Sequence, residues 1–145
     1  MRIQLLAAVA IVAVSTPVTA FADNPFDKIR FDDISAVLQK YLDGTQYGKP
    51  ELVEDAFLPS LEVQFLNQDR TLGRRAAAAY IGNIEKDKEV SRNGRIISID
   101  GTHNAAMAKI EIDTGTRLYT DYMLLLKVEG EWRISNKIAT WITQD

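Results

Sequence analysis

The last third of the chain contains four segments of strand composition separated by short glycine-bearing pairs, and no other feature constrains the fold as strongly. The segments are 95–100, 105–113, 117–128 and 131–142. The pairs between them are Asp100-Gly101, Thr114-Gly115 and Glu129-Gly130, which are residue types that tight turns require. The pattern predicts a four-stranded antiparallel meander. Because its strands exceed the usual length of about five or six residues, we expect a strongly twisted and curved sheet.

Two helices are predicted ahead of the sheet. Apolar residues recur every three to four positions over 34–42, which places them on one face of a helix. Gly48 can end this helix in the left-handed conformation. Pro50 then opens a second, short helix at its first position, where the missing N–H does no harm, and Pro59 stops it.

A half-buried strand over 61–65, a short strand over 71–73 and a third helix over 74–85 follow. Helices gathered over one face of an antiparallel sheet give an α+β architecture. No linker divides the chain further, so we expect a single domain.

The first 22 residues have the pattern of a cleavable signal peptide. Arg2 supplies a positive start, 3–14 is almost entirely apolar, and small-residue cleavage patterns end at Ala20 and Ala22. The apolar run is shorter than the roughly 20 residues of a spanning helix, so cleavage after Ala22 is expected rather than an uncleaved anchor. The mature chain, 23–145, is then predicted to be periplasmic or secreted, with no stable membrane insertion.

The composition excludes several classes of function. The chain has no Cys and one His, which excludes thiol catalysis and thiolate metal sites and argues against zinc. We expect no metal and no cofactor. The lone His103 lies beside a predicted turn, where exposure to solvent is the usual state. The chain has 17 Lys and Arg against 20 Asp and Glu, and this balance argues against a nucleic-acid partner.

A two-residue turn at Glu129-Gly130 would pair Val128 with Glu131 and thereby decide which side chains share a face. One face is predicted to carry Tyr119, Asp121, Met123 and Leu125 with Trp132, Ile134, Asn136 and Ile138. The other is predicted to carry Tyr122, Leu124, Leu126 and Val128 with Arg133, Ser135, Lys137 and Trp141. Both faces are largely apolar. One would meet the helices and a pocket and the other a dimer partner, and the sequence leaves open which is which.

Four short motifs accompany this element order: YLDG at 41–44, AFLP at 56–59, TDYMLL at 120–125 and WRISNK at 132–137. Together they resemble the nuclear transport factor 2-like superfamily and, within it, the putative lumazine-binding branch, over about residues 32–141. The resemblance implies a cystatin-like α+β roll, in which a curved sheet wraps three helices into a cone with an apolar pocket. It also implies a homodimer packed through the outer sheet face. Members of the branch often carry His between the Phe and the Pro of the second motif, and this chain has Leu58 there instead.

Asp121 is the candidate for chemistry, because its carboxylate lies mid-strand among apolar residues. Partial burial beside tyrosines such as Tyr119, Tyr122 or Tyr80 would suit a general base. The alternative is structural: the carboxylate would cap backbone groups near a strand irregularity or pair with a cation, as buried carboxylates usually do. The candidate cations are Lys137, Arg117 and Arg133.

Aromatic side chains offer flat surfaces for an aromatic or heterocyclic ligand, although each is also what an ordinary core contains. The candidate ligand-binding residues are Tyr41, Phe57, Phe65, Tyr80, Tyr119, Asp121, Trp132 and Asn136.

Positive charge concentrates between Arg70 and Arg95, interleaved with Asp and Glu. This pattern predicts a solvated, self-paired surface. Within it, Arg74-Arg75 at the start of the third predicted helix is the candidate anion site, through the N–H groups of the helix end.

The leading functional hypothesis is an exported module that binds a small apolar or heterocyclic, lumazine-like molecule. One alternative is an enzyme similar to ketosteroid isomerase or polyketide cyclases, with Asp121 as its general base. Another is a dimeric interaction module. Membership of a fold cannot decide among them.

Overall fold

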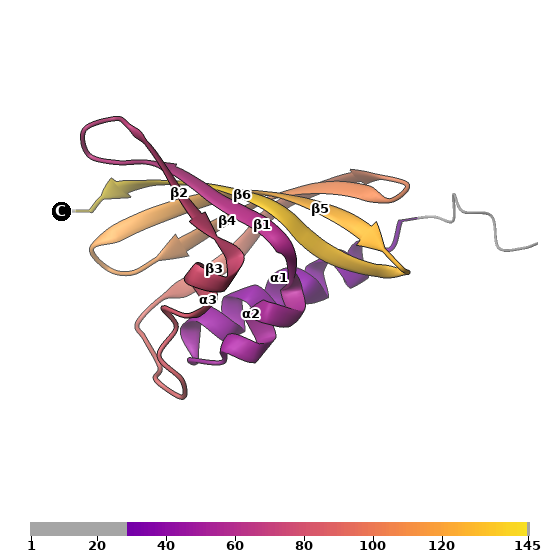
Figure 1. Ribbon diagram of the computed structural model, residues 1–145, viewed down its shortest axis with the longest axis horizontal. Coiled ribbons are helices and arrows are strands. Elements are labelled where there is room, and N and C mark those ends of the chain that lie inside the picture. Colours follow the sequence, from indigo (N-terminus) through magenta and orange to yellow (C-terminus); the bar gives the residue numbers. More distant parts are fainter. Residues whose placement is uncertain (1–28, 145) are drawn as a thin grey trace, which may run out of the picture.

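The computed structural model describes residues 29–144. The predicted signal peptide, residues 1–22, lies outside the described residues. The elements, labelled in Figure 1, are α1 (Phe31–Gln46), α2 (Pro50–Ala56), β1 (Phe57–Leu66), β2 (Leu72–Ala76), α3 (Ala77–Ile81), β3 (Asn93–Thr102), β4 (Ala105–Asp113), β5 (Arg117–Val128) and β6 (Glu131–Thr143).

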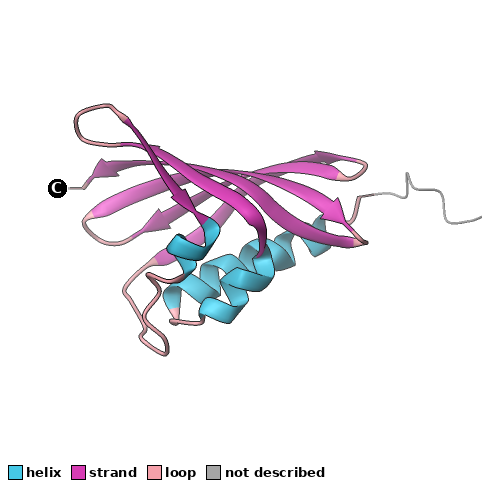
Figure 2. Ribbon diagram, viewed as in Figure 1, coloured by secondary structure: helices cyan, strands magenta, loops and turns pink. Residues whose placement is uncertain are grey.

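The six strands form one curved, open sheet in the order β2-β1-β6-β5-β4-β3. All neighbours are antiparallel except β1 and β6, which are parallel, so the sheet is mixed. The three helices lie together on one side of the sheet (Figure 2). The predicted α+β architecture, a curved sheet packed on three helices, is confirmed.

The C-terminal meander follows the sequence pattern closely. β4 and β5 have the predicted bounds, and β6 runs one residue further than predicted. Glu129 and Gly130 form the two-residue turn with φ of 53° and 87°, and Val128 pairs with Glu131. The predicted turn at Asp100-Gly101 is wrong, because β3 continues to Thr102 and the chain reverses after it at His103, which has a φ of 57°.

Two predicted helices are shorter in the structure, because strands take over their ends. α2 stops at Ala56, and Phe57 begins β1. Pro59 therefore lies in a strand rather than ending a helix. The pairing of β1 with β6 is interrupted between Phe57 and Glu62, so the missing N–H of Pro59 leaves no gap in a regular ladder. In the same way Arg74 and Arg75 belong to β2, where they pair with β1, and α3 begins only at Ala77.

The core lies between α1, α2 and the helix-facing side of the sheet. α1 contributes the face predicted from its periodicity, and the central strands contribute alternate residues. The largest fully buried core side chains include Tyr41, Ile34, Leu38, Leu61, Ile110, Ile112, Met123, Leu125 and Ile134. Towards the start of β5 and the end of β6, the side chains of Tyr119 and Trp141 are only partly buried.

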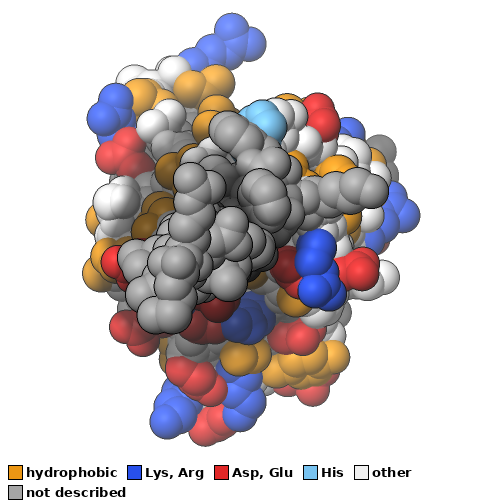
Figure 3. All heavy atoms as spheres, turned by 90° about the vertical axis from the view of Figure 1, so that its right-hand side faces the viewer, with side chains coloured by type: hydrophobic (Ala, Val, Ile, Leu, Met, Phe, Trp, Pro, Cys, Tyr) orange, Lys and Arg blue, Asp and Glu red, His pale blue; other side chains and the backbone are white. Residues whose placement is uncertain are grey.

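No helix within residues 29–144 is long and apolar enough to cross a membrane. On the face of the molecule shown in Figure 3, Lys and Arg side chains are intermixed with Asp and Glu side chains.

Candidate functional site

The site depends on a β-bulge in β6. From the turn, Val128 to Leu125 pair with Glu131 to Ile134 as predicted, but Leu124 pairs with Asn136, so Ser135 is an extra residue. The hydroxyl of Ser135 donates to the carbonyl of Leu124 at 3.1 Å. Because side chains alternate along a strand, one extra residue reverses the face of every residue beyond it.

The prediction that Asn136 and Ile138 share the face of Asp121 is therefore wrong. Ile138 is half-exposed on the outer face, and Asn136 pairs with the outward-facing Leu124. Lys137 and Trp141, which were predicted to point away from Asp121, instead lie on its face.

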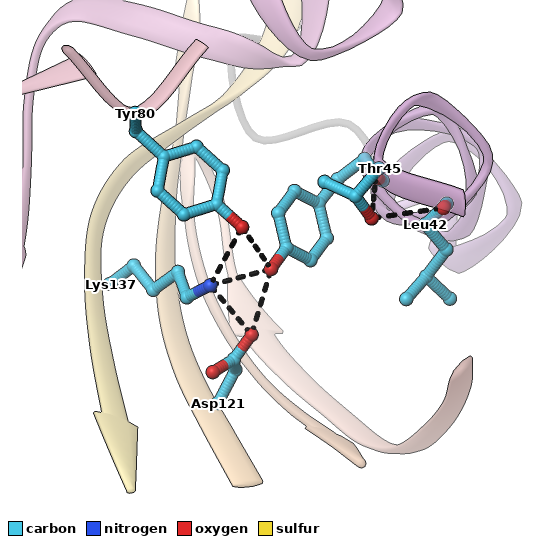
Figure 4. A network of polar contacts seen from close by, with 6 residues as sticks. Leu42, Thr45, Tyr80, Asp121 and Lys137 are labelled. Atoms are coloured by element: carbon cyan, nitrogen blue, oxygen red, sulfur yellow. Dashed lines mark hydrogen bonds and ion pairs between the residues drawn. The ribbon is translucent and has the colours of Figure 1, made fainter. Parts of the chain in front are cut away.

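The bulge brings Lys137 to Asp121 under the helices, and the two side chains form a buried ion pair (Figure 4). The Nζ atom of Lys137 lies 2.8 Å from Oδ2 of Asp121, and their side chains are 5% and 2% exposed. Of the three partners considered for Asp121, the structure selects Lys137. The structural role considered for Asp121, pairing with a cation, is therefore present in the fold.

Two tyrosines complete the network. The hydroxyl of Tyr41, on α1, donates to Oδ2 of Asp121 at 2.9 Å and accepts a hydrogen bond from Lys137. The hydroxyl of Tyr80, on α3, lies 3.0 Å from that of Tyr41 and 3.4 Å from Nζ of Lys137. The single hydroxyl proton of Tyr41 is donated to Asp121, so the Tyr80 hydroxyl must donate the hydrogen bond to Tyr41.

The donors of this network are fully used. All three N–H groups of Lys137 have an oxygen acceptor, and so does each tyrosine hydroxyl. Oδ2 of Asp121 accepts two hydrogen bonds, whereas Oδ1 receives none from residues 29–144. The carboxylate therefore keeps one free acceptor, which a ligand could use.

Aromatic rings surround the ammonium of Lys137. Its Nζ lies 4.7 Å from the ring centre of Tyr41 and 4.8 Å from that of Tyr80, within the range of a cation–π interaction. Phe57 stacks on Tyr41 with ring centres 5.7 Å apart. These contacts partly replace the water that the buried charge has lost.

The network shifts the pKa values of its members in different directions. Burial and the charge of Asp121 raise the pKa of Tyr41 well above its usual value. Burial also raises the pKa of Tyr80, but the positive charges of Lys137 and Arg92 outweigh it and lower the net value. Burial lowers the pKa of Lys137, but the charges of Tyr80 and Asp121 and the hydrogen bond to Asp121 raise it overall. Lys137 is therefore an ammonium, and Tyr80 ionises before Tyr41.

A cavity of about 350 Å³ opens beside this network, at the end of the sheet that α1 leaves uncovered. This volume is at the lower end of the range for small-molecule sites, about 300–1,000 Å³. Its walls are aromatic and aliphatic with a few charged groups. The lining residues used below are Phe65, Arg75, Tyr80, Arg92, Tyr119, Asp121, Lys137 and Trp141.

The loop that carries Arg92 to this cavity is attached to the end of α1. The N–H of Asp87 donates to the carbonyl of Gly48 at 2.7 Å, and the N–H of Val90 donates to Gln46 at 2.9 Å. Gly48 has a φ of +63°, and a Cβ there would lie 2.4 Å from the backbone nitrogen of Lys88. Only glycine meets both conditions. The predicted left-handed position of Gly48 is thus occupied, and it also allows the loop to approach.

The structure separates the predicted site residues into three groups. Phe65, Tyr80, Tyr119 and Asp121 line the cavity. Tyr41 and Phe57 are buried behind it. Trp132 is buried near α1 beside a different hollow, and Asn136 is not among the lining residues.

Sequence reasoning missed the cationic part of the site. Lys137 and Trp141 were placed on the wrong face, because no residue type marks the bulge at Ser135. Arg92 was assigned to a self-paired surface, although it lines the cavity. Arg75 was expected at a helix start and instead faces the cavity from β2. The run of three consecutive polar residues, SNK at 135–137, was the one available signal.

Within residues 29–144, no group of three or more His, Cys, Asp or Glu side chains is arranged to hold a metal ion.

With this geometry established, comparison with known proteins gives a consistent result. Residues 30–139 match the family described as "Putative lumazine-binding". The chain belongs to that family. No curated protein matches the sequence.

Solved structures show that this member of the family has a nuclear transport factor 2-like fold. An NTF2-like protein of unknown function from Shewanella baltica OS155 is 26% identical, with a TM-score of 0.70 over 79% of this chain and 94% of that one. Another from Silicibacter pomeroyi DSS-3 is 22% identical, with a TM-score of 0.69 over 77% and 95%. A cystatin-like fold protein from Burkholderia xenovorans LB400 is 14% identical, with a TM-score of 0.60 over 79% and 92%. The superfamily and the branch inferred from the motifs are confirmed.

Proposed function

We propose that this chain is an exported binding protein that holds a small planar molecule in the cavity beside Lys137 and Asp121. The observation that carries the proposal is the combination of an open cavity of about 350 Å³ with a rigid polar floor. The floor is rigid because every donor of Lys137, Tyr41 and Tyr80 is already engaged. A preformed, partly apolar cavity of this kind binds ligand with little ordering cost.

The walls favour a flat ligand. The ring centres of Tyr119 and Trp141 lie 5.9 Å apart with the rings tilted by 42°, and Phe65 on β1 also lines the cavity. Aromatic surfaces of this kind interact best with planar rings. The family description is consistent with a heterocycle such as a lumazine.

Native mass spectrometry of the purified protein, followed by thermal shift with pteridines, flavins and steroids, tests the proposal. A ligand present at about 100 times its Kd stabilises the folded state by about 2.7 kcal/mol, which is readily measured. Ala139 lines the cavity and Thr140 is exposed on the other face. Ala139→Phe should therefore abolish the shift, and Thr140→Phe should keep it. No co-purified ligand and no stabilisation by any compound would contradict the proposal.

Asp121 favours one second candidate function. Its free Oδ1 atom could accept a proton, as a ketosteroid isomerase- or cyclase-like general base must. Binding remains our proposal, because Oδ2 is held by Lys137 and Tyr41 in a complete structural network. Assay of proton exchange at the α-carbon of cyclic ketones, with Asp121→Asn as the comparison, separates the two: exchange that the variant loses supports the enzyme.

Export is part of the proposal and is supported by the signal-peptide pattern of residues 1–22. Expression of the full chain in a bacterial host, followed by cell fractionation and N-terminal sequencing, tests it. We expect mature protein beginning at Asp23 in the periplasm or medium. Protein that remains in the cytoplasm with Met1 intact would contradict export.

We also propose a homodimer formed through the outer face of the sheet. Exposed apolar side chains cluster there on three neighbouring strands: Met107 on β4, Tyr122, Leu124 and Leu126 on β5, and Ile138 on β6. A second copy is the occupant we favour, because an apolar patch can pack on itself about a two-fold axis, and the one charged side chain beside Tyr122, Lys109, lies 3.8 Å from Glu111.

A further inference from the structure

Charges at the cavity are not balanced. Its charged lining residues are Arg75, Arg92, Lys137 and Asp121. Lys137 and Asp121 neutralise each other. The side chains of Arg75 and Arg92 make no ion pair or hydrogen bond with any residue in 29–144. The charged lining residues of the cavity therefore sum to +2, and the acidic residue nearest along the adjoining cavity, Glu85, pairs with Lys88 at 2.7 Å.

Arg75 is held against the cavity wall. In β2 it pairs with Val63, which in turn pairs with Lys137, so these three residues form one row across the helix-facing side of the sheet. The guanidinium of Arg75 lies 5.8 Å from the ring centre of Phe65. Its neighbour Arg74 points to the opposite face and lies 3.6 Å from Glu62. Of these two adjacent arginines, only Arg75 is available to a ligand in the cavity.

Arg92 is half-buried at the end of the anchored loop. The positive charge of Arg92 lowers the pKa of Tyr80 and acts to lower the pKa of Lys137. Arg92 therefore lies close enough to both side chains to interact with them electrostatically. Placing Arg92 near Lys137 without an anion costs free energy through repulsion of like charges. A bound anion would remove that cost and form hydrogen bonds with the guanidinium.

Arg75, Tyr80 and Arg92 also mark a boundary. They line both the main cavity and a second one of about 250 Å³ on the other side. Of these two cavities, Tyr119 and Trp141 line the main one and not the second, whereas Asn83, Glu85 and Lys88 line the second and not the main one. A ligand that fits both has its ring among the aromatic residues and its charged group at the boundary.

We propose that Arg75 and Arg92 bind the anionic group of the ligand, and hence that the ligand is a planar aromatic or heterocyclic ring carrying a carboxylate or a phosphate. This inference rests on the proposed binding function and adds the chemical class of the ligand to it. Arginine forms two parallel hydrogen bonds with either anionic group. The two arginines therefore select for the charge of the ligand, and the aromatic walls select for its ring.

Isothermal titration calorimetry with matched pairs of probes tests the inference. The pairs are pterin-6-carboxylate with 6-hydroxymethylpterin, and 2-naphthoate with 2-naphthamide. Riboflavin 5′-phosphate and riboflavin form a third pair, which distinguishes a phosphate from a carboxylate. We expect the anion of at least one pair to bind about 10-fold more tightly than its neutral partner, as for a hydrogen bond to a charged group. Added NaCl should weaken binding of the anion only.

Variants identify the arginines responsible. In Arg92→Gln and Arg75→Gln the preference for the anion over its neutral partner should fall from about 10-fold towards 1. Arg74→Gln is the matched control and should keep the preference, because its side chain lies on the opposite face. Circular dichroism shows whether each variant is folded.

Four results would overturn the inference. Equal binding of anion and neutral partner in every pair would leave a binding cavity without anion selectivity, and so would spare the proposed function. An equal loss in Arg74→Gln and Arg92→Gln would indicate a general effect of surface charge. If no anionic probe binds while a neutral compound stabilises the protein in the thermal-shift panel, the anion site alone is wrong; if no compound binds at all, both proposals fail.

Discussion

The ammonium of Lys137 lies 2.8 Å from Oδ2 of Asp121, and both side chains are almost completely buried. A buried ion pair contributes little net stability, because desolvating two charges costs about as much as their attraction returns. Removing one partner is different, since the other is left as an unpaired buried charge. Single and double substitutions of the pair should therefore have very different effects on stability, which tests whether the two side chains form the buried pair.

Lys137→Met should destabilise the protein by about 3–5 kcal/mol. The double variant Asp121→Leu/Lys137→Met should recover most of this loss, because it leaves no buried charge and the hydroxyls of Tyr41 and Tyr80 still bond to each other. Urea unfolding of wild type, both single variants and the double variant measures the coupling. Losses that simply add would show that the pair does not act as a unit.

Tyr41→Phe should destabilise the protein by about 1.5–3 kcal/mol, the usual value of a hydrogen bond to a charged group. The hydroxyl of Tyr41 donates to Asp121 and accepts from Lys137, so both charges lose a partner. Tyr47→Phe is the matched control, because Tyr47 is 44% exposed. Urea midpoints that shift equally in the two variants would be evidence against a central role for Tyr41.

Spectrophotometric titration of the tyrosines tests the electrostatics around Arg92. The positive charges of Lys137 and Arg92 lower the pKa of Tyr80, so the first tyrosine to ionise should be missing in Tyr80→Phe. Arg92→Gln removes one of these charges and should raise the pKa of Tyr80. Arg95→Gln serves as the control, because Arg95 pairs with Glu111 at the surface. A titration curve that Arg92→Gln leaves unchanged would contradict the placement of Arg92.

Asp55 should contribute to stability at neutral pH and lose its contribution in acid. Its carboxylate, on α2, binds Lys40 of α1 and Arg133 of β6, and the hydrogen bond from Lys40 is the main cause of its lowered pKa. Because the folded value lies below the unfolded one, this stability is present above about pH 4 and disappears as the pH falls through the folded pKa.

Asp55→Asn should therefore lower the unfolding midpoint at pH 7 and flatten its fall between about pH 5 and pH 2. The neighbouring Glu54 makes no ion pair with a described residue, so Glu54→Gln is the control. An acid limb as steep in Asp55→Asn as in wild type would assign the loss to other carboxylates.

Leu124→Lys should convert the proposed dimer to a monomer, because it places a charge at the centre of the apolar patch on the outer face. Leu124 is 54% exposed in the single chain. Val90→Lys, at an exposed position in the loop before β3, should leave assembly unchanged. Sedimentation velocity across a range of concentrations measures both; a wild-type protein that remains monomeric at all of them would refute the dimer.

The accuracy of the sequence-based predictions followed the strength of local signals. Glu129-Gly130 specified its turn chemically, and the bounds of β4 and β5 followed from such turns. α3 was predicted too long, because Arg74 and Arg75 pair with β1 as part of β2, so the helix begins only at Ala77 and ends at Ile81. The aromatic part of the site could be found because Tyr80 and Phe65 lie on apolar faces. Its cationic part could not be found, since it depends on one bulge and one loop that only tertiary contacts define.

The bulge at Ser135 divides β6 into two stretches with opposite rules for substitution. Before it, even-numbered positions such as 132 and 134 are inaccessible to solvent, and after it the odd-numbered positions 137, 139 and 141 face the helices or the cavity. A saturation scan along this strand should therefore show a tolerance that alternates with period two and changes phase at residue 135. Family members that lack the extra residue would present a different set of side chains to the same cavity, so a single insertion or deletion at this point can change what the fold binds without changing the fold.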